Sequence, residues 1–241
     1  MEVTSTEIQN NFGTYLKLAQ VEEVFVTRNG KRIAVLKCWD EQSGNEMNAA
    51  ESKGMYREEH PRITVEEFLK LSEASESRYE LIDGEVYQLA SPSYEHQRIL
   101  IEILNMIHLW SKGKKCKPVV APFDVRVMSD TETNIVQPDI IVICDPENID
   151  NRGKYNGTPT LVLEVLSETT RNKDMLKKLN LYMSGGVKEY WIVNPWNREI
   201  YIYTFDSGEI NNYRAFKGND QANSEVLEGL VIFLEVVFAM E

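Results

Sequence analysis

Two apolar stretches of the sequence each carry a single acid, and these acids are the first candidates for chemistry. Asp139 lies within residues 135–143 and Glu164 within residues 160–167, both otherwise rich in Ile, Val and Leu. A carboxylate inside a buried strand costs free energy unless it is paired or bound to a metal. Pro138 cannot donate to a sheet ladder, so it predicts a bulge or strand entry that redirects Asp139. We expect the two stretches to pair and their acids to converge.

Convergent carboxylates without a neighbouring His or Cys favour a hard cation that prefers oxygen ligands. The sequence therefore predicts a magnesium or manganese site formed by Asp139 and Glu164. Such an ion lowers the pKa of a bound water and neutralises charge on a phosphate under attack. The predicted chemistry is attack of a metal-activated water on a phosphate group.

A lysine would complete this chemistry by orienting the water or stabilising the developing oxyanion. The position two residues after Glu164, on the same face of the strand, is occupied by Leu166. The next candidate is Lys178, on the helix predicted at about 173–184. Asp174, Lys178 and Tyr182 are spaced i, i+4 and i+8, so they share one helix face.

The elements that must position these residues are read from apolar periodicity and turn signals. Helices are expected at about 64–71, 96–110 and 173–184, and a hairpin at 79–89. Further strands are expected at 119–127, 136–143, 160–166, 189–193, 199–204 and 211–216. The pattern predicts an α/β (α+β) fold in which helices flank a mixed sheet.

The N-terminal part has a different pattern. A short amphipathic helix with a Thr4–Glu7 capping box precedes two apolar runs separated by Asn29-Gly30, a strong hairpin signal. So small a helix-hairpin unit buries too little surface to be stable alone. We predict an N-terminal unit at 1–45, a polar linker at 46–61 and the main domain at 62–241.

Composition narrows the class of protein. The formal net charge is −12, which disfavours a broad nucleic-acid-binding surface, so a site for nucleic acid must be local. The three cysteines lie far apart outside any C-x-x-C pair, which argues against both a disulfide framework and a zinc cluster. No apolar run is long enough for a membrane span and no export signal is evident. A soluble, cytoplasmic protein is expected.

Several motifs of the larger part occur together in a known family. They are Tyr79-Glu-Leu-Ile-Asp-Gly-Glu, Ser93 with His96, Pro138-Asp139, Leu163-Glu-Val-Leu-Ser167, Thr169 or Thr170, Asp174 to Lys178, Tyr182 and Gly186-Val-Lys-Glu-Tyr-Trp-Ile-Val. With them, residues 62–205 resemble the Uma-type endonuclease family of the PD-(D/E)XK nuclease superfamily. The resemblance implies a restriction-endonuclease-like fold.

The resemblance also implies roles for individual residues. Asp139 and Glu164 would be the metal ligands, Lys178 would replace the lysine missing after the Glu, and Glu80 matches an additional acidic position. The accessory candidates His96, Ser167 and Asp174 have local alternatives. His96 could be a helix N-terminal residue, and Ser167 could orient Glu164 or start a turn. The role of Asp174 could be limited to helping to hold Lys178. Where the family usually has Asp, this chain has Asn194, which is either structural or a missing charge.

The first 40 or so residues resemble the Phd/YefM antitoxin family through Val3-Thr-Ser-Thr-Glu, Asn11-Phe-Gly and Val26-Thr-Arg-Asn-Gly-Lys-Arg-Ile-Ala-Val-Leu. That family dimerises through its helix-hairpin unit and binds operator DNA. The resemblance implies a homodimer in which Thr4, Ser5, Arg28 and Lys31 contact DNA. The family's toxin-binding tail is not recognisable.

The leading hypothesis is a Mg²⁺- or Mn²⁺-dependent endonuclease that hydrolyses DNA. The first alternative is a catalytically silent nuclease fold that acts as a DNA-binding regulator, and the second is an antitoxin-like protein that sequesters another protein. Locally, Glu164 and Lys178 could instead form a structural ion pair.

Overall fold

The computed structural model describes residues 1–10, 15, 19, 23–28, 30–37, 62–128, 133–167 and 177–239. The chain divides into two compact units, 1–58 and 59–241. The predicted linker at 46–61 and the candidate Asp174 lie outside the described residues. No helix among the described residues is long and apolar enough to cross a membrane.

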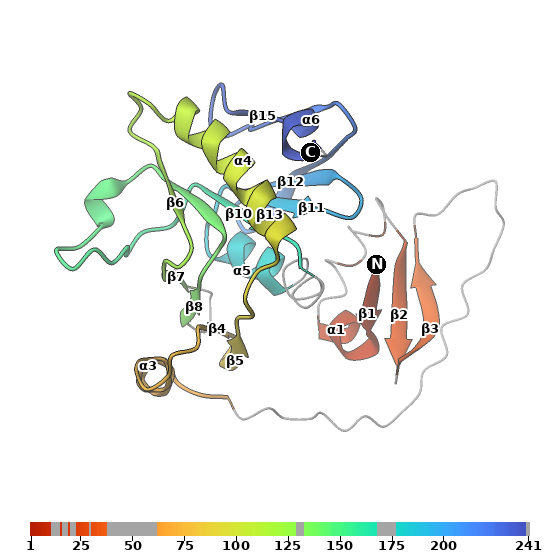
Figure 1. Cartoon of the computed structure of the whole chain (residues 1–241). Coiled ribbons are helices and arrows are strands. Elements are labelled where there is room, and N and C mark those ends of the chain that lie inside the picture. The colour runs from red at the N-terminus through yellow and green to blue at the C-terminus, as the bar shows by residue number, and fades with distance from the viewer. Residues whose placement is uncertain are drawn as a thin grey trace. The chain divides into compact units, whose positions relative to one another are not determined.

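The first unit contains a three-stranded sheet and a short helix. Its strand order is β1-β2-β3, with β1 parallel and β3 antiparallel to β2 (Figure 1). Thr4 Oγ1 accepts from the amide N–H of Glu7, while the Thr4 amide donates to the Glu7 carboxylate, so a capping box starts the helix. The elements are β1 (Glu2–Thr4), α1 (Ser5–Asn10), β2 (Val24–Arg28) and β3 (Lys31–Leu36).

The second unit is built on a six-stranded mixed sheet. Only the β10–β11 pair is parallel within this described sheet, and the other neighbours are antiparallel. In spatial order the strands are β13 (Glu209–Lys217), β12 (Glu199–Asp206), β11 (Glu189–Asn194), β10 (Leu161–Val165), β9 (Ile140–Ile143) and β6 (Lys117–Val120). Every residue of β9, β10 and β11 is buried, as expected for strands covered on both faces.

A smaller four-stranded sheet lies in the same unit. Its strands, in spatial order, are β5 (Glu85–Gln88), β4 (Tyr79–Ile82), β8 (Thr133–Val136) and β7 (Val125–Met128). Helix α3 (Val65–Glu73) packs on it through Phe68, which is buried with Leu81 and Ile135. The predicted capping box of α3 is confirmed, because Thr64 and Glu67 bond reciprocally.

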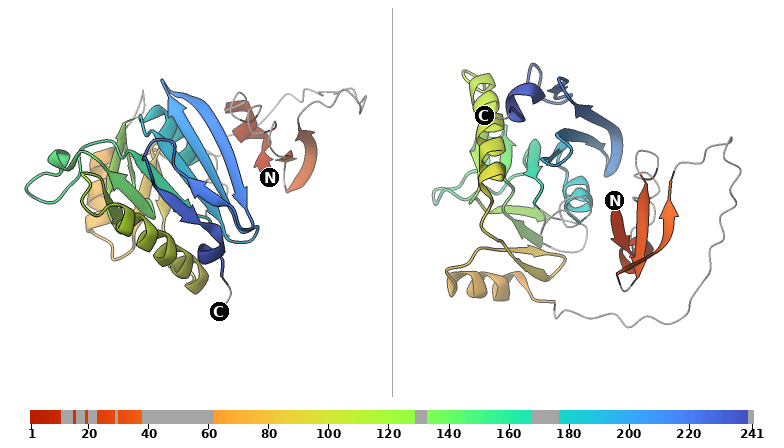
Figure 2. Two further views of the ribbon diagram at one scale, coloured as in Figure 1. Left: turned by 90° about the horizontal axis from the view of Figure 1, so that it is seen from above. Right: turned by 45° about the vertical axis from the view of Figure 1, so that its right-hand side comes forward.

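Two helices cover opposite faces of the six-stranded sheet (Figure 2). Helix α4 (Tyr94–Trp110) buries Ile99, Ile103 and Ile107 at a spacing of four against the odd-numbered residues of β10. Helix α5 (Lys178–Ser184) meets the even-numbered side of β10 through Lys178 and Tyr182. Because neighbouring side chains alternate along a strand, Glu164 points away from α4 and toward α5.

Some predicted elements have different bounds. The strands expected at 119–127 and 136–143 are each two strands, β6 with β7 and β8 with β9. Pro122 and Pro138 lie at the breaks, where their missing N–H groups would interrupt a ladder. Short C-terminal elements were not predicted, since three or four residues carry too little periodicity. They are β14 (Gln221–Asn223), β15 (Val231–Phe233) and α6 (Leu234–Val237).

The expectation from the cysteine spacing was wrong for one pair. Cys116 and Cys144 form a disulfide. They are 28 residues apart in sequence, but the pairing of Lys117 with Ile143 places them opposite each other just beyond the ends of the antiparallel strands β6 and β9, with Cα atoms 4.0 Å apart. Spacing along the chain does not reveal such a cross-strand pair, whereas strand register does.

Candidate active site

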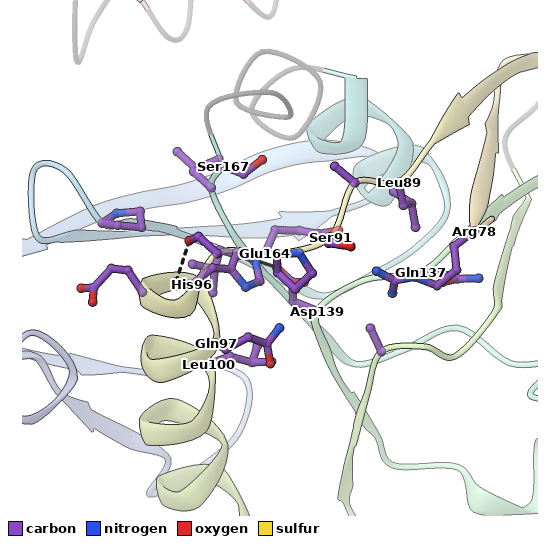
Figure 3. A pocket seen from close by; sticks show the side chains of 18 of the residues that line it. Arg78, Leu89, Ser91, His96, Gln97, Leu100, Gln137, Asp139, Glu164 and Ser167 are labelled. Carbon is purple, nitrogen blue, oxygen red and sulfur yellow. Dashed lines mark hydrogen bonds and ion pairs between the residues drawn. The ribbon is translucent and has the colours of Figure 1, made fainter. Parts of the chain in front are cut away.

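A cavity of about 540 Å³ opens where β10 ends and α4 begins (Figure 3). Five sequence-predicted site residues line it together: His96, Asp139, Glu164, Ser167 and Lys178. They come from a helix N-terminus, two neighbouring strand ends and the start of a second helix. The structure therefore brings these five candidates together at one point of the fold.

Glu164 and Lys178 form a buried ion pair, and Glu80 shares the same ammonium. Lys178 Nζ lies 2.6 Å from Glu164 Oε1 and 2.8 Å from Glu80 Oε1. The three residues are 3%, 2% and 0% exposed, in the order Glu164, Lys178, Glu80. Two carboxylates thus share one cation, and such a buried group is stable only while every charge keeps its partner.

Glu80 differs from Glu164 in its surroundings. It lies on β4, in the smaller sheet, and is absent from the described cavity lining. Its Oε1 also accepts the backbone N–H of Gln137 at 3.0 Å. These contacts make Glu80 a residue that fixes Lys178 rather than one that reaches the cavity.

Tyr182 was noted in the sequence for its helical spacing and as part of the family motifs, and the structure gives it a contact. Its hydroxyl donates to Glu164 Oε1 at 2.9 Å, one helical turn after Lys178. The same carboxylate oxygen therefore receives a hydroxyl from Tyr182 and an ammonium from Lys178. This pair of contacts fixes how Glu164 faces the cavity.

Asp139 is held by two donors beside Glu164. Its Oδ2 accepts the backbone N–H of Val165 at 2.8 Å and lies 3.1 Å from His96 Nε2. The register that pairs Leu163 with Ile140 continues to a position at which Asp139 faces Glu164 across the strands. Neighbours of this kind in an antiparallel pair point to the same face, which explains their convergence.

His96 combines the two roles that the sequence left open. It sits in the first turn of α4, where its amide donates to the N-cap residue Ser93 at 3.2 Å. Its ring simultaneously reaches Asp139 across the cavity. Ser167 follows β10 on the cavity wall, and buried Leu166 occupies the position where a lysine was sought.

The whole constellation lies within a segment that matches a known protein family. The family described as "Putative restriction endonuclease", Uma2, matches residues 65–236, most of the chain. The chain belongs to the Uma2 family.

The chain is also similar to individual proteins and to a solved structure. An uncharacterized protein of Synechocystis sp., slr1290, is 28% identical over 159 residues, covering 64% of this chain and 82% of its own length. A second one, sll1609, is 25% identical over 136 residues, covering 56% and 76%. A crystal structure of a putative nuclease belonging to DUF820 from Anabaena variabilis shares the fold, with a TM-score of 0.57 at 22% identity. It covers 73% of this chain and 98% of that one.

The donor chemistry of this Uma2 site suits a hard cation. Asp139 and Glu164 bring carboxylate oxygens to one cavity. The expectation that no His lies near them was wrong, because His96 Nε2 is 3.1 Å from Asp139 Oδ2. Within the described residues, no group of three or more His, Cys, Asp or Glu side chains is already arranged as a metal cluster. The two acids therefore fit Mg²⁺ or Mn²⁺ by ligand type, as a pair whose remaining ligands would be water or substrate.

Asn194, the departure from the Uma2 pattern, has a structural contact. It ends β11, is 2% exposed, and its Oδ1 accepts the backbone N–H groups of Trp196 and Asn197 at 3.1 and 3.2 Å. Either an amide or a carboxylate oxygen can accept these bonds. The turn therefore does not require a charge at position 194.

Other residues of the cavity wall had no signal in the sequence. Arg78 precedes β4 and Trp196 lies in the turn after β11, and both line the cavity. Neither stands in an apolar run or at a periodic spacing that would have singled it out. Only the fold brings them to Asp139 and Glu164.

Proposed function

We propose that this chain is a divalent-metal-dependent nuclease that hydrolyses phosphodiester bonds of DNA. The observation that carries the proposal is the convergence of Asp139, Glu164 and the buried ammonium of Lys178 on one cavity. Membership of the Uma2 family, whose description is a restriction endonuclease, supports the same reaction class.

Asp139 and Glu164 would hold the ion, Mg²⁺ or Mn²⁺. When bound, the ion supplies Lewis-acid chemistry and activates water for attack on phosphorus. His96 and the Val165 amide orient Asp139, and Tyr182 orients Glu164. These contacts preorganise the acids before substrate arrives.

Lys178 supplies positive charge beside the two acids. In a low-dielectric pocket an ammonium stabilises charge that develops on a phosphoryl oxygen. Glu80 keeps this ammonium in place from the side away from the cavity. The arrangement also explains how the site manages without a lysine at Leu166.

The structural ion pair considered for Glu164 and Lys178 does exist in the structure. A purely structural pair has no need of a cavity, whereas this one borders a cavity that Asp139 also lines. The cavity and the second acid favour a catalytic role for the pair.

The test is cleavage of plasmid and single-stranded DNA with Mg²⁺ or Mn²⁺ by the wild type and Asp139→Asn. The variant keeps an acceptor for the Val165 amide while losing the charge. We expect its cleavage rate to fall at least about 100-fold, the scale of losing a group that stabilises the transition state.

Asp145→Asn is the matched control. Asp145 lies near the other end of β9, accepts the Tyr155 hydroxyl at 2.6 Å and is outside the described cavity lining. Its variant should cleave like the wild type. Equal activity of Asp139→Asn and wild type would reject the site, and no metal-dependent cleavage by the wild type would favour the silent regulator.

For the first unit we propose DNA contacts by Thr4, Ser5, Arg28 and Lys31. The structure pairs Arg28 with Lys31 across β2 and β3, and Thr4 with Thr27 across β1 and β2, so the four lie at one end of the sheet. Arg28→Ala with Lys31→Ala should weaken binding to duplex DNA and lower its salt dependence. Unchanged binding would reject this surface.

We also propose that this unit forms a homodimer, because a unit of its size buries little surface by itself. Sedimentation of the full chain tests the dimer. A monomer at micromolar concentration would reject it. A pull-down that recovers one stable protein partner instead would favour the antitoxin-like alternative.

A further inference from the structure

Trp196 is the large aromatic residue on the cavity wall. Its relative exposure is 48%, whereas Trp191 is fully buried and Trp110 is half-buried with its ring N–H bonded to the carbonyl of Glu228. An exposed indole loses the free energy that burial of its apolar area would give. The position of Trp196 beside a polar cavity therefore points to a ligand with a flat apolar face.

The backbone around Trp196 is fixed. Asn194 Oδ1 accepts its N–H, and Arg198 ends the turn in the left-handed region with a φ of 55°. Non-glycine residues adopt this conformation rarely, and mostly in tight turns. The indole is thus presented by a held turn and loses little freedom on binding.

The charges of the cavity wall do not suit a duplex. Among the described lining residues, Arg78 and Lys178 are the only Arg or Lys, and the same lining includes the acids Glu95, Asp139 and Glu164. The chain as a whole carries a formal charge of −12. Surfaces that bind duplex DNA are broad and strongly positive, because they neutralise many phosphates.

The size of the cavity also argues against binding of a DNA duplex. Its volume of about 540 Å³ lies within the range of small-ligand sites rather than of a groove for a double helix. Stacking on an aromatic ring gives affinity for unpaired bases without many cationic contacts. In the view of Figure 3, Arg78 and Ser167 lie on opposite sides of Asp139 and Glu164, and the Arg78 guanidinium on the cavity wall is a group that can bind a backbone phosphate.

We propose that the cavity takes single-stranded DNA, with an unpaired base stacked on Trp196 and a backbone phosphate bound by Arg78. This inference rests on the nuclease function proposed above, and it names the substrate class of that site. Arg78 and Trp196 line the same cavity as Asp139 and Glu164, so a strand held in this way lies in the cavity that contains the two acids. Duplex DNA enters only where its bases are unpaired.

The test measures binding of a fluorescent thymidine hexanucleotide to the full chain by anisotropy, in EDTA so that no cleavage occurs. All proteins carry Arg28→Ala and Lys31→Ala, which removes the contacts proposed for the first unit. Trp196→Ala should weaken binding about 5- to 150-fold, the range for one lost base–aromatic stack. Trp196→Phe should stay within a few-fold of the parent. Phe233→Ala, which removes a partly exposed aromatic outside the described lining, should change nothing.

Arg78 has its own readout. Arg78→Ala should weaken binding and lower the slope of log affinity against log salt by about 0.7, the value for one phosphate of a single strand. Arg126→Ala removes an exposed arginine of β7 outside the described lining and should leave the slope unchanged. An unchanged slope in Arg78→Ala removes Arg78 from the proposal.

The outcomes separate this inference from the nuclease function. No binding of the hexanucleotide by the parent, or equal affinity of the parent and Trp196→Ala, would overturn it. So would an equally strong interaction with the same sequence annealed to its complement. Trp196-dependent binding without metal-dependent cleavage would instead reject the nuclease function and leave this substrate class standing.

Discussion

Two acids on neighbouring strands of one sheet, Glu164 on β10 and Glu189 on β11, show what makes a buried carboxylate a candidate for chemistry. Both lie in strands whose residues are all buried. The register pairs Glu189 with Leu161, three residues along the strand from Glu164. Burial alone would therefore make both acids equally good candidates for catalysis.

Their partners differ. Glu189 accepts the Ser224 hydroxyl and, at 2.9 Å, the Glu225 amide, so it anchors the segment after β14 and lies outside the described cavity lining. Glu164 is held by groups that leave it on the wall of a cavity, beside a second acid. A buried acid is a candidate for catalysis when it lines a cavity beside a second charged group. An acid whose hydrogen-bond donors come from a loop is structural.

The largest effect on the comparison should come from Lys178, the buried ammonium that Glu164 shares with Glu80. Lys178→Met leaves Glu80 and Glu164 buried without their counterion, which should cost about 3–5 kcal/mol of unfolding free energy. Lys177 is the matched control, because it is next in sequence but pairs with half-exposed Glu85 at 2.7 Å. Lys177→Met should cost no more than about 1 kcal/mol. Urea unfolding measures the loss of unfolding free energy in both variants. Equal losses would contradict the claim that Lys178 is the counterion of two buried carboxylates.

A bound metal ion should stabilise the folded protein through Glu164 and not through Glu189. Mg²⁺ or Mn²⁺ at ten times its Kd should raise the unfolding free energy by about 1.4 kcal/mol in the wild type. Glu164→Gln should lose most of this gain, and Glu189→Gln should keep it. Thermal unfolding with and without the ion measures the difference, and an equal gain in all three proteins would place the ion elsewhere.

The pH dependence of stability should distinguish Glu189. Burial raises its pKa above the ordinary value of 4.5, against the lowering effect of its hydrogen bonds to Ser224 and Glu225. A raised pKa in the folded state means that the folded chain holds this proton more tightly. The stabilising contribution of this bound proton to the free energy of unfolding is complete below pH 4.5 and is lost as pH rises through the raised pKa. Relative to Glu189→Gln, the wild type should therefore lose stability as pH rises above 4.5. Parallel pH profiles in urea unfolding would contradict this.

The smallest effect is expected from a third acid, added at the end of β11. In Asn194→Asp the carboxylate would accept the same N–H groups of Trp196 and Asn197, as Glu189 is held by its loop. Stability should change by no more than about 1 kcal/mol, and cleavage by less than tenfold. A large gain in cleavage would show that Asn194 marks a missing catalytic charge.

Local chemistry explains which features the sequence could predict. The burial of Glu164 follows from a single acid in an apolar run, and the shared helix face of Lys178 and Tyr182 follows from helical spacing. The disulfide of Cys116 with Cys144 and the contact of Glu80 with Lys178 depend on register and on how two sheets meet. These relations join residues far apart in the chain, so no local pattern encodes them.

The most direct test of the central claim is metal-dependent DNA cleavage by Glu164→Gln and Glu189→Gln, side by side. Each variant keeps a hydrogen-bond acceptor and loses one buried charge. We predict that Glu164→Gln loses at least about 100-fold in rate while remaining folded, and that Glu189→Gln cleaves like the wild type. Equal activity of the two variants would contradict the assignment of Glu164 to the reacting site.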